Sequence, residues 1–174
     1  MPPYERDPQY GPEGWAAIVR VVRGVALEAR SLPRFERLDR RWKRITALAE
    51  AIPDAVLARA RAAEAVSCER AARLFSDCDV LLTPVAPEPP VEIGRWEGRG
   101  ALWAINGAGR LVPYTAPWNF TGQPAAAVPS GLTAGGLPLA VQLVGRPNDE
   151  ATLLSLSAQL ESERPWADRR PPVT

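Results

Sequence analysis

The sequence predicts an α/β protein with a partial mixed β-sheet and flanking helices. Residues 1–78 carry apolar side chains at helical spacing, whereas residues 79–174 hold a short apolar run, an irregular stretch, a hairpin pattern and a final helix. Many of the 19 prolines lie between these segments, where they interrupt helices. The strands so predicted are few for this much apolar helix, so we expect the chain to supply only part of a sheet.

Two helices are predicted first, over residues 14–30 and 35–51, with Pro33 between them and Pro53 after the second. In both segments apolar residues recur every three or four positions and the charged residues fall on the opposite face. The buried faces are predicted to include Trp15, Ile18, Val22, Ala26, Trp42, Ile45 and Leu48.

A third helix is predicted over residues 54–76. Asp54 stands where its carboxylate can cap the first turn by accepting from free N–H groups. Its apolar face is a narrow stripe of mostly small side chains, which allows a close approach by a neighbouring element. The members of the stripe are Ala60, Ala63, Ser67, Ala71 and Leu74.

The pattern changes after this helix. Residues 79–84 form a continuous apolar run that ends at proline, which is typical of a strand buried on both faces, as in parallel sheets. Residues 85–118 are expected to be irregular apart from a short helix near 100–110. Residues 124–129 and 137–145 are predicted to pair as an antiparallel hairpin across a turn-forming segment.

A last helix is predicted to start near Asp149 and Glu150, because acidic side chains favour the positive end of a helix, and to end at Pro165. The side chains expected to face inward are Leu153, Leu154, Leu156 and Leu160.

Composition excludes several classes of function. The net charge is +1, from 21 basic and 20 acidic residues, so neither nucleic acid nor a membrane is expected as a partner. The chain contains no histidine, which excludes histidine-based triads and histidine-bearing zinc sites. Cys68 and Cys78 are too few for a four-thiolate site and are predicted to be reduced, buried thiols.

No catalytic group of residues emerges from the composition. A serine needs a base at neutral pH, and Lys43 is the lone lysine. Ser130 is the best-placed serine, but a turn residue is the favoured interpretation. Asp77 and Asp79 are expected to cap the junction between helix and strand rather than to form an acid–base pair.

The second half of the chain resembles the C-terminal part of amidase signature enzymes, and the helices before it, with residues 6–10 ahead of them, are similar to the preceding segment of bacterial members. Each matching segment alone is weakly diagnostic, whereas the set in order and spacing is specific. The segments are 79–84, 115–125, 128–131, 136–145 and 149–154.

The resemblance implies that residues 1–174 are the C-terminal portion of a larger amidase domain. It implies hydrolysis of carbon–nitrogen amide bonds by two serines and a lysine, without a metal or an organic cofactor. In the family these three residues lie upstream of the matching segments, so no catalytic residue is assigned here and the chain is predicted to be inactive alone. Its contribution would be scaffold and part of the substrate pocket, at a cytoplasmic location.

Within that pocket the resemblance points to Thr115, Trp118 and Asn119. Trp118 is expected to line the pocket and Asn119 to hold the loop through its amide, with structural packing as the alternative for both. Residues 111–114 lack the acid that the glutamine-hydrolysing A subunit of the tRNA amidotransferase is expected to carry, which favours an apolar or aromatic amide over glutamine.

A second hypothesis comes from a different class. The chain would then be a non-catalytic interaction module or remnant that pairs with a partner chain, or with itself, through an open sheet edge and the small-residue helix.

Overall fold

The computed structural model describes residues 14–95 and 97–168. The segment 6–10, which contributed to the family resemblance, lies outside these residues. Helices α1 (Gly14–Ser31), α2 (Arg40–Glu50) and α3 (Asp54–Leu74) come first, then strand β1 (Val80–Pro84). Helices α4 (Ala101–Leu111) and α5 (Ala116–Thr121) precede strands β2 (Ala125–Leu132) and β3 (Pro138–Gly145), and helix α6 (Glu150–Glu163) ends the order. The predicted α/β class is confirmed.

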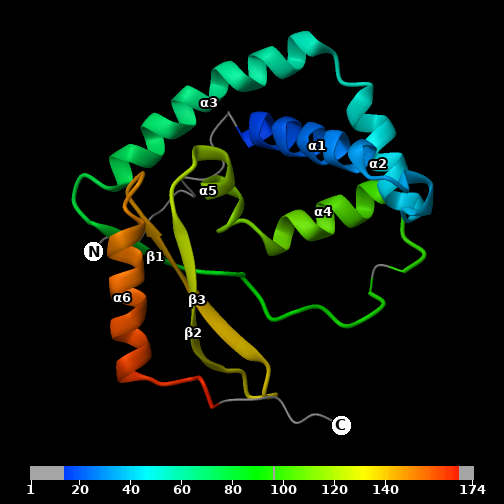
Figure 1. Cartoon of the computed structure of the whole chain (residues 1–174). Coiled ribbons are helices and arrows are strands. Elements are labelled where there is room, and N and C mark those ends of the chain that lie inside the picture. Colours follow the sequence, from blue (N-terminus) through cyan, green and yellow to red (C-terminus); the bar gives the residue numbers. More distant parts are fainter. Residues whose placement is uncertain (1–13, 96, 169–174) are drawn as a thin grey trace.

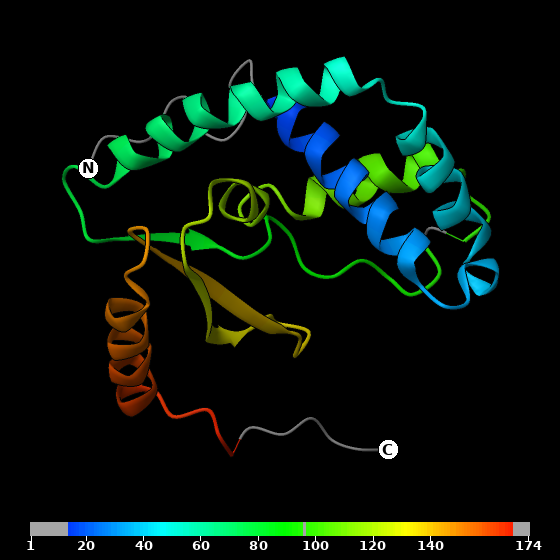
Figure 2. The ribbon, with the colours of Figure 1, turned by 45° about the horizontal axis from the view of Figure 1, so that its top comes forward.

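The helices form two groups about a small sheet (Figures 1 and 2). In Figure 2 the long helix α3 passes on one side of the sheet and α6 lies on the other, whereas α1, α2 and α4 gather away from the strands. Helix α3 contacts both α1 and α5, and α2 contacts α4. Helix α3 thereby links the helical group to the sheet.

The second predicted helix is wrong as one continuous element. A single 3-10 turn spans Phe35–Arg37, and Leu38 and Asp39 are then extended before α2 begins. The carboxylate of Asp39 accepts the backbone N–H of Arg41 at 2.7 Å, which satisfies a free donor of the first helical turn. An aspartate therefore starts a new helix inside an otherwise regular apolar pattern.

The predicted cap of α3 is also corrected. Pro53 occupies the cap position and Asp54 is the first helical residue, with no side-chain cap bond. The Asp54 carboxylate instead lies 3.3 Å from the Arg23 guanidinium on α1. Asp54 therefore forms an ion pair with a neighbouring helix instead of capping its own helix.

The small-residue stripe of α3 packs closely, as predicted. Ala60 is fully buried against Ala16 of α1 and Phe120 of α5. About three turns further on, Ala71 contacts Trp118 and Val144 in a second cluster. Two of the stripe's alanines thus let α3 approach both α5 and the sheet.

The hairpin is confirmed. Strand β2 pairs antiparallel with β3, with a bulge between Pro129 and Gly131, and the sheet order is β1-β3-β2. Strand β1 was predicted to be a parallel-type strand buried on both faces, and this is wrong: it pairs antiparallel with β3, and Leu82 is 67% exposed. Every strand pairing among the described residues is antiparallel. In the order β1-β3-β2, β1 has one neighbouring strand and therefore lies at an open edge of the described sheet.

Two further elements refine the prediction. Helix α4 confirms the short helix near 100–110, whereas α5 lies in a stretch expected to be irregular. Proline in its first turn and Gly122 after its end, at φ 81°, are the residues that favour such a short helix.

Helix α6 begins at the Asp149 cap, whose carboxylate accepts from the Thr152 N–H and hydroxyl. Its inward face holds Leu153, Leu156 and Leu160, which pack on β2 and β3. Leu154 was predicted to face inward, but it is 70% exposed, because it lies off that stripe.

Candidate functional site

The segment predicted to contribute to a substrate pocket forms the entry to α5. The backbone N–H groups of Thr115 and Ala116 both donate to the Val112 carbonyl, at 3.3 and 3.0 Å, and the Thr115 hydroxyl donates to the same oxygen at 3.3 Å. This turn places Thr115, which is half-buried, directly before the helix.

Trp118 is a core side chain in this structure. It is 6% exposed and lies in one cluster with Ala71, Phe75 and Val144, between α3 and β3. Its indole Nε1 is buried and has no hydrogen-bond partner among the described residues. Asn119 is exposed, because adjacent positions of a helix point about 100° apart. The three predicted residues therefore face different surroundings, and their role in a pocket stays a prediction.

A buried amide that the sequence analysis missed holds this segment against the sheet. The Gln142 side chain on β3 is 5% exposed, and its Nε2 donates to the Thr83 hydroxyl at 3.0 Å and to the Tyr114 carbonyl at 2.7 Å. Gln142 thus joins β3, β1 and the turn before α5. The available signal was a single polar residue inside the apolar run of residues 139–144.

A second set of polar contacts closes the other end of α5. The Thr121 hydroxyl bonds the side chain of Gln123, which is buried, and donates to the Pro117 carbonyl at 3.0 Å. Cys68 on α3 lies with its sulfur 3.9 Å from the Thr121 carbonyl. Both cysteines are free and half-buried, so the prediction of free thiols holds and that of full burial does not.

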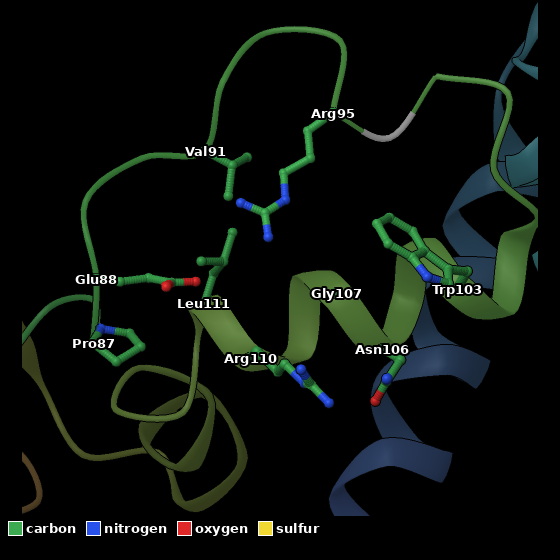
Figure 3. Close-up of a pocket in the computed structure, with 9 residues that line it drawn as sticks. All are labelled: Pro87, Glu88, Val91, Arg95, Trp103, Asn106, Gly107, Arg110 and Leu111. Carbon is green, nitrogen blue, oxygen red and sulfur yellow. The ribbon is translucent and has the colours of Figure 1, made fainter.

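A cavity of about 490 Å³ lies between α4 and the loop that follows β1 (Figure 3). Its floor is one face of α4, formed by Trp103, Asn106, Gly107, Arg110 and Leu111. None of Thr115, Trp118 and Asn119 belongs to its lining. This cavity could not be predicted from the sequence, because only the fold brings its two walls together.

Ser130 and Lys43 do not come together. Ser130 is exposed at the bulge of β2, and the Lys43 ammonium on α2 donates to the Glu36 carbonyl. Figures 1 and 2 both show α2 well away from β2. Ser130 was predicted to be a turn residue, and this is wrong, because β2 continues to Leu132 and Ser130 lies within the strand at its bulge. The two groups form no nucleophile–base pair.

Two acidic side chains, Asp79 and Glu50, form ion pairs that join separate elements of the fold. Asp79 lies 3.1 Å from Arg146, whose guanidinium also donates to the carbonyls of Phe75 and Cys78. Arg146 thus ties the end of β3 to the α3–β1 connection. Arg30 on α1 forms a bidentate salt bridge with Glu50 on α2, in which Nε and Nη2 donate to the two carboxylate oxygens at 2.6 and 2.8 Å. These hydrogen bonds lower the pKa of the Glu50 carboxyl.

The described residues contain no group of three or more histidine, cysteine, aspartate or glutamate side chains suited to a metal ion. Within the same part of the chain, no helix has the length and apolar character needed to cross a membrane.

Solved structures of longer proteins share this architecture. A structure of 6-aminohexanoate cyclic dimer hydrolase superposes with a TM-score of 0.75 at 25% identity, covering 88% of this chain and 35% of that one. The A subunit of the Glutamyl-tRNA(Gln) amidotransferase of Thermotoga maritima superposes with a TM-score of 0.63 at 22% identity, covering 88% of this chain and 33% of that one, and shows likeness of fold. The chain therefore has the fold of about a third of each of these proteins.

A family model described as Amidase matches residues 10–154, and the chain belongs to this family. The protein of Mycobacterium tuberculosis that is named "Putative amidase AmiB2" is 45% identical over 170 residues. The 6-aminohexanoate-cyclic-dimer hydrolase of Pseudomonas sp. is 38% identical over 101 residues, covering 53% of this chain and 20% of that protein. The family resemblance inferred from the sequence is confirmed.

The match to the mycobacterial relative covers 97% of this chain but 37% of the relative. The chain thus spans a little over a third of this longer relative.

Proposed function

We propose that this chain forms the C-terminal part of an amidase, where it supplies scaffold and one wall of the substrate pocket for hydrolysis of a carbon–nitrogen amide bond. The observation that carries the proposal is the coverage: nearly all of the chain matches a relative of which it spans 37%. In this proposal the nucleophile and its base lie in the remaining part of the enzyme, and the chain alone is inactive.

The distribution of apolar side chains supports an incomplete domain. Trp15, Ile18, Trp42 and Leu48 were predicted to be buried by helix periodicity, yet they are 43, 58, 47 and 52% exposed. Their helical spacing is that of a face packed against another element. The rest of an amidase is the surface that we propose covers them.

Within the complete enzyme we place Thr115, Trp118 and Asn119 beside the acyl part of the substrate. Their support is the network of Gln142 and Tyr114, which holds the turn before α5 to the sheet. The absence of an acid in residues 111–114 favours an apolar or aromatic amide over glutamine as the substrate. The cytoplasmic location stays a prediction.

The test is a chimera. The segment of the 45% identical relative that matches this chain is replaced by residues 1–174, and hydrolysis of simple aryl and alkyl amides is measured for the chimera, the relative and the isolated chain. We expect the chimera to hydrolyse amides and the isolated chain to show no turnover. Turnover by the isolated chain that Ser130→Ala abolishes would contradict the proposal.

The open edge of β1 favours the alternative of an interaction module, because an unpaired strand edge invites pairing with another chain. An inactive chimera that is nonetheless folded, together with a stable complex between the isolated chain and a partner, would favour this alternative over the amidase proposal.

A further inference from the structure

One wall of the cavity beside α4 is a continuous face of that helix. Trp103, Asn106, Gly107, Arg110 and Leu111 follow the spacing of residues that share a face, so the helix presents a ring, an amide, a guanidinium and an aliphatic chain to one space. Gly107 carries no side chain, which leaves the middle of this face open. This wall of the cavity therefore carries both polar and apolar side chains around Gly107 (Figure 3).

The loop over the cavity is stiffened by proline. Pro87 lines the cavity, and Pro84, Pro89 and Pro90 lie within three residues of it. Each proline restricts its own φ, and it also restricts the residue before it. A wall with few accessible conformations loses little entropy when a ligand binds, which favours a site that exists before the ligand arrives.

The charges around the cavity are not neutralised within it. Arg95 comes from the loop and Arg110 from the helix, and neither forms an ion pair with a carboxylate of the described residues. Glu88 is the one acid in the lining. Figure 3 shows the Arg95 side chain directed from the loop toward α4. Two guanidinium groups and one carboxylate leave a positive balance.

The cavity also offers apolar contact area. Val91 and Leu111 contribute aliphatic side chains, and Trp103 is 42% exposed. The Arg99 guanidinium lies 4.9 Å from the centre of the Trp103 ring, which helps to hold that ring in place. A volume of about 490 Å³ is within the range of small-molecule sites.

We propose that this cavity binds a small ligand with a carboxylate at one end and an apolar or aromatic body. Arg95 donates to the carboxylate, for which a guanidinium group is well suited. The body lies over Gly107 against Trp103, Val91 and Leu111. Glu88 opposes a second negative charge and therefore favours ligands with one carboxylate over those with two. All the residues that this proposal uses belong to this chain, and its test does not require hydrolysis.

The test compares two probes of the same shape, 4-phenylbutyrate and its neutral amide, by saturation-transfer NMR on the 174-residue chain. This measurement reads binding to monomers and to assemblies alike. We expect the carboxylate to bind about tenfold more tightly than the amide, the size expected for charge-assisted hydrogen bonds. Arg95→Gln should remove that preference and leave the affinity for the amide unchanged.

Two further variants separate local recognition from general charge and from damage to the fold. Arg61→Gln on the exposed surface of α3 changes the net charge as Arg95→Gln does, and should leave binding unchanged. Glu88→Gln should tighten binding of the carboxylate several-fold, which unfolding would not do. Equal affinity for the two probes, no saturable binding, or equal effects of Arg61→Gln and Arg95→Gln would overturn the proposal. No outcome depends on amide turnover, so the chimera test and this one fail separately.

Discussion

The buried side chain of Gln142 links the turn before α5 to the sheet. It is 5% exposed, and its amide donates both to the Thr83 hydroxyl on β1 and to the Tyr114 carbonyl before α5. A buried amide is tolerated in a strand when its donors are bonded, and a buried carbonyl that loses its donor keeps the desolvation cost. One side chain therefore positions the segment that carries Thr115.

We expect Gln142→Leu to lower the free energy of unfolding by about 1–3 kcal/mol, because the Tyr114 carbonyl is left without this donor. Thr83→Val is the matched control: it removes the longer of the two bonds and keeps the shape, so its loss should be clearly smaller. Urea titration followed by tryptophan fluorescence measures both. Equal losses in the two variants would show that the Tyr114 contact is not the important one.

At the scale of the element, the start of α2 carries a dependence on pH. Hydrogen bonds from the backbone and side chain of Arg41 lower the pKa of the Asp39 carboxyl. The folded pKa is thus below the unfolded value of about 3.9, so the cap stabilises α2 fully above that pH. Its contribution is lost as the pH falls through the lowered folded pKa.

Asp39→Asn tests this dependence, because asparagine keeps a capping oxygen but has no proton to gain. We expect the two proteins to have similar helical content near pH 7, measured by circular dichroism. As the pH falls below about 4, the native protein should lose helical signal relative to Asp39→Asn. Parallel curves over this range would mean that the carboxylate contributes nothing to the start of the helix.

The close packing of α6 on the end of β3 requires the small residue Gly145. A Cβ built at Gly145 would lie 3.2 Å from Leu153 Cγ and 3.4 Å from the Asp149 carbonyl oxygen. Leu153 is 3% exposed, so it has little room to move. We expect Gly145→Ala to lower the free energy of unfolding by about 1–2 kcal/mol through overpacking.

The control is Gly24→Ala within α1, where a Cβ would meet nothing within 4 Å. Alanine favours a helix interior, so this variant should raise stability by about 0.5–1 kcal/mol. The two substitutions add the same methyl group and should have opposite signs in denaturant unfolding. A neutral or stabilising Gly145→Ala would mean that α6 is not seated closely on the strand.

At the scale of the whole molecule, the core is divided. Among the described residues, three clusters of buried apolar side chains lie between α3, α5 and the sheet, between α1, α3 and α5, and between the sheet and α6. Further buried side chains on α1 and α2 lie outside these clusters: Ala26, Ala29, Ile45 and Ala49. Large apolar side chains remain exposed on α1, α2, β1 and α6. Since monomers rarely expose large apolar patches, we expect the isolated chain to associate or to require a partner.

Leu82 and Leu27 allow the cause of association to be identified, because each is 67% exposed, one on the open strand β1 and the other on α1. If pairing at the sheet edge drives association, Leu82→Lys should shift the chain toward the monomer in size-exclusion chromatography. Leu27→Lys should not. A monodisperse native monomer that unfolds cooperatively, with a denaturant slope normal for its length, would contradict the incomplete-domain proposal.

The sequence by itself determined the features that depend on neighbouring residues along the chain. The helix periodicity over 14–30, the hairpin with its turn, the Asp149 start of α6 and the stop before Pro165 are all local, and all are confirmed. The family was likewise readable from short segments in order. Local chemistry was insufficient where two local signals competed, as when Asp39 began a helix inside a longer apolar pattern.

Only the tertiary structure decided which partner each side chain contacts and which apolar faces are buried. Asp54 pairs with Arg23 rather than capping its own helix, and Leu82 is exposed because no described element covers its side of the sheet at β1. The bonds of Gln142 and the cavity above α4 join segments that are far apart in sequence. Periodicity indicates that a face is apolar, but burial depends on whether another surface is present to exclude water from it.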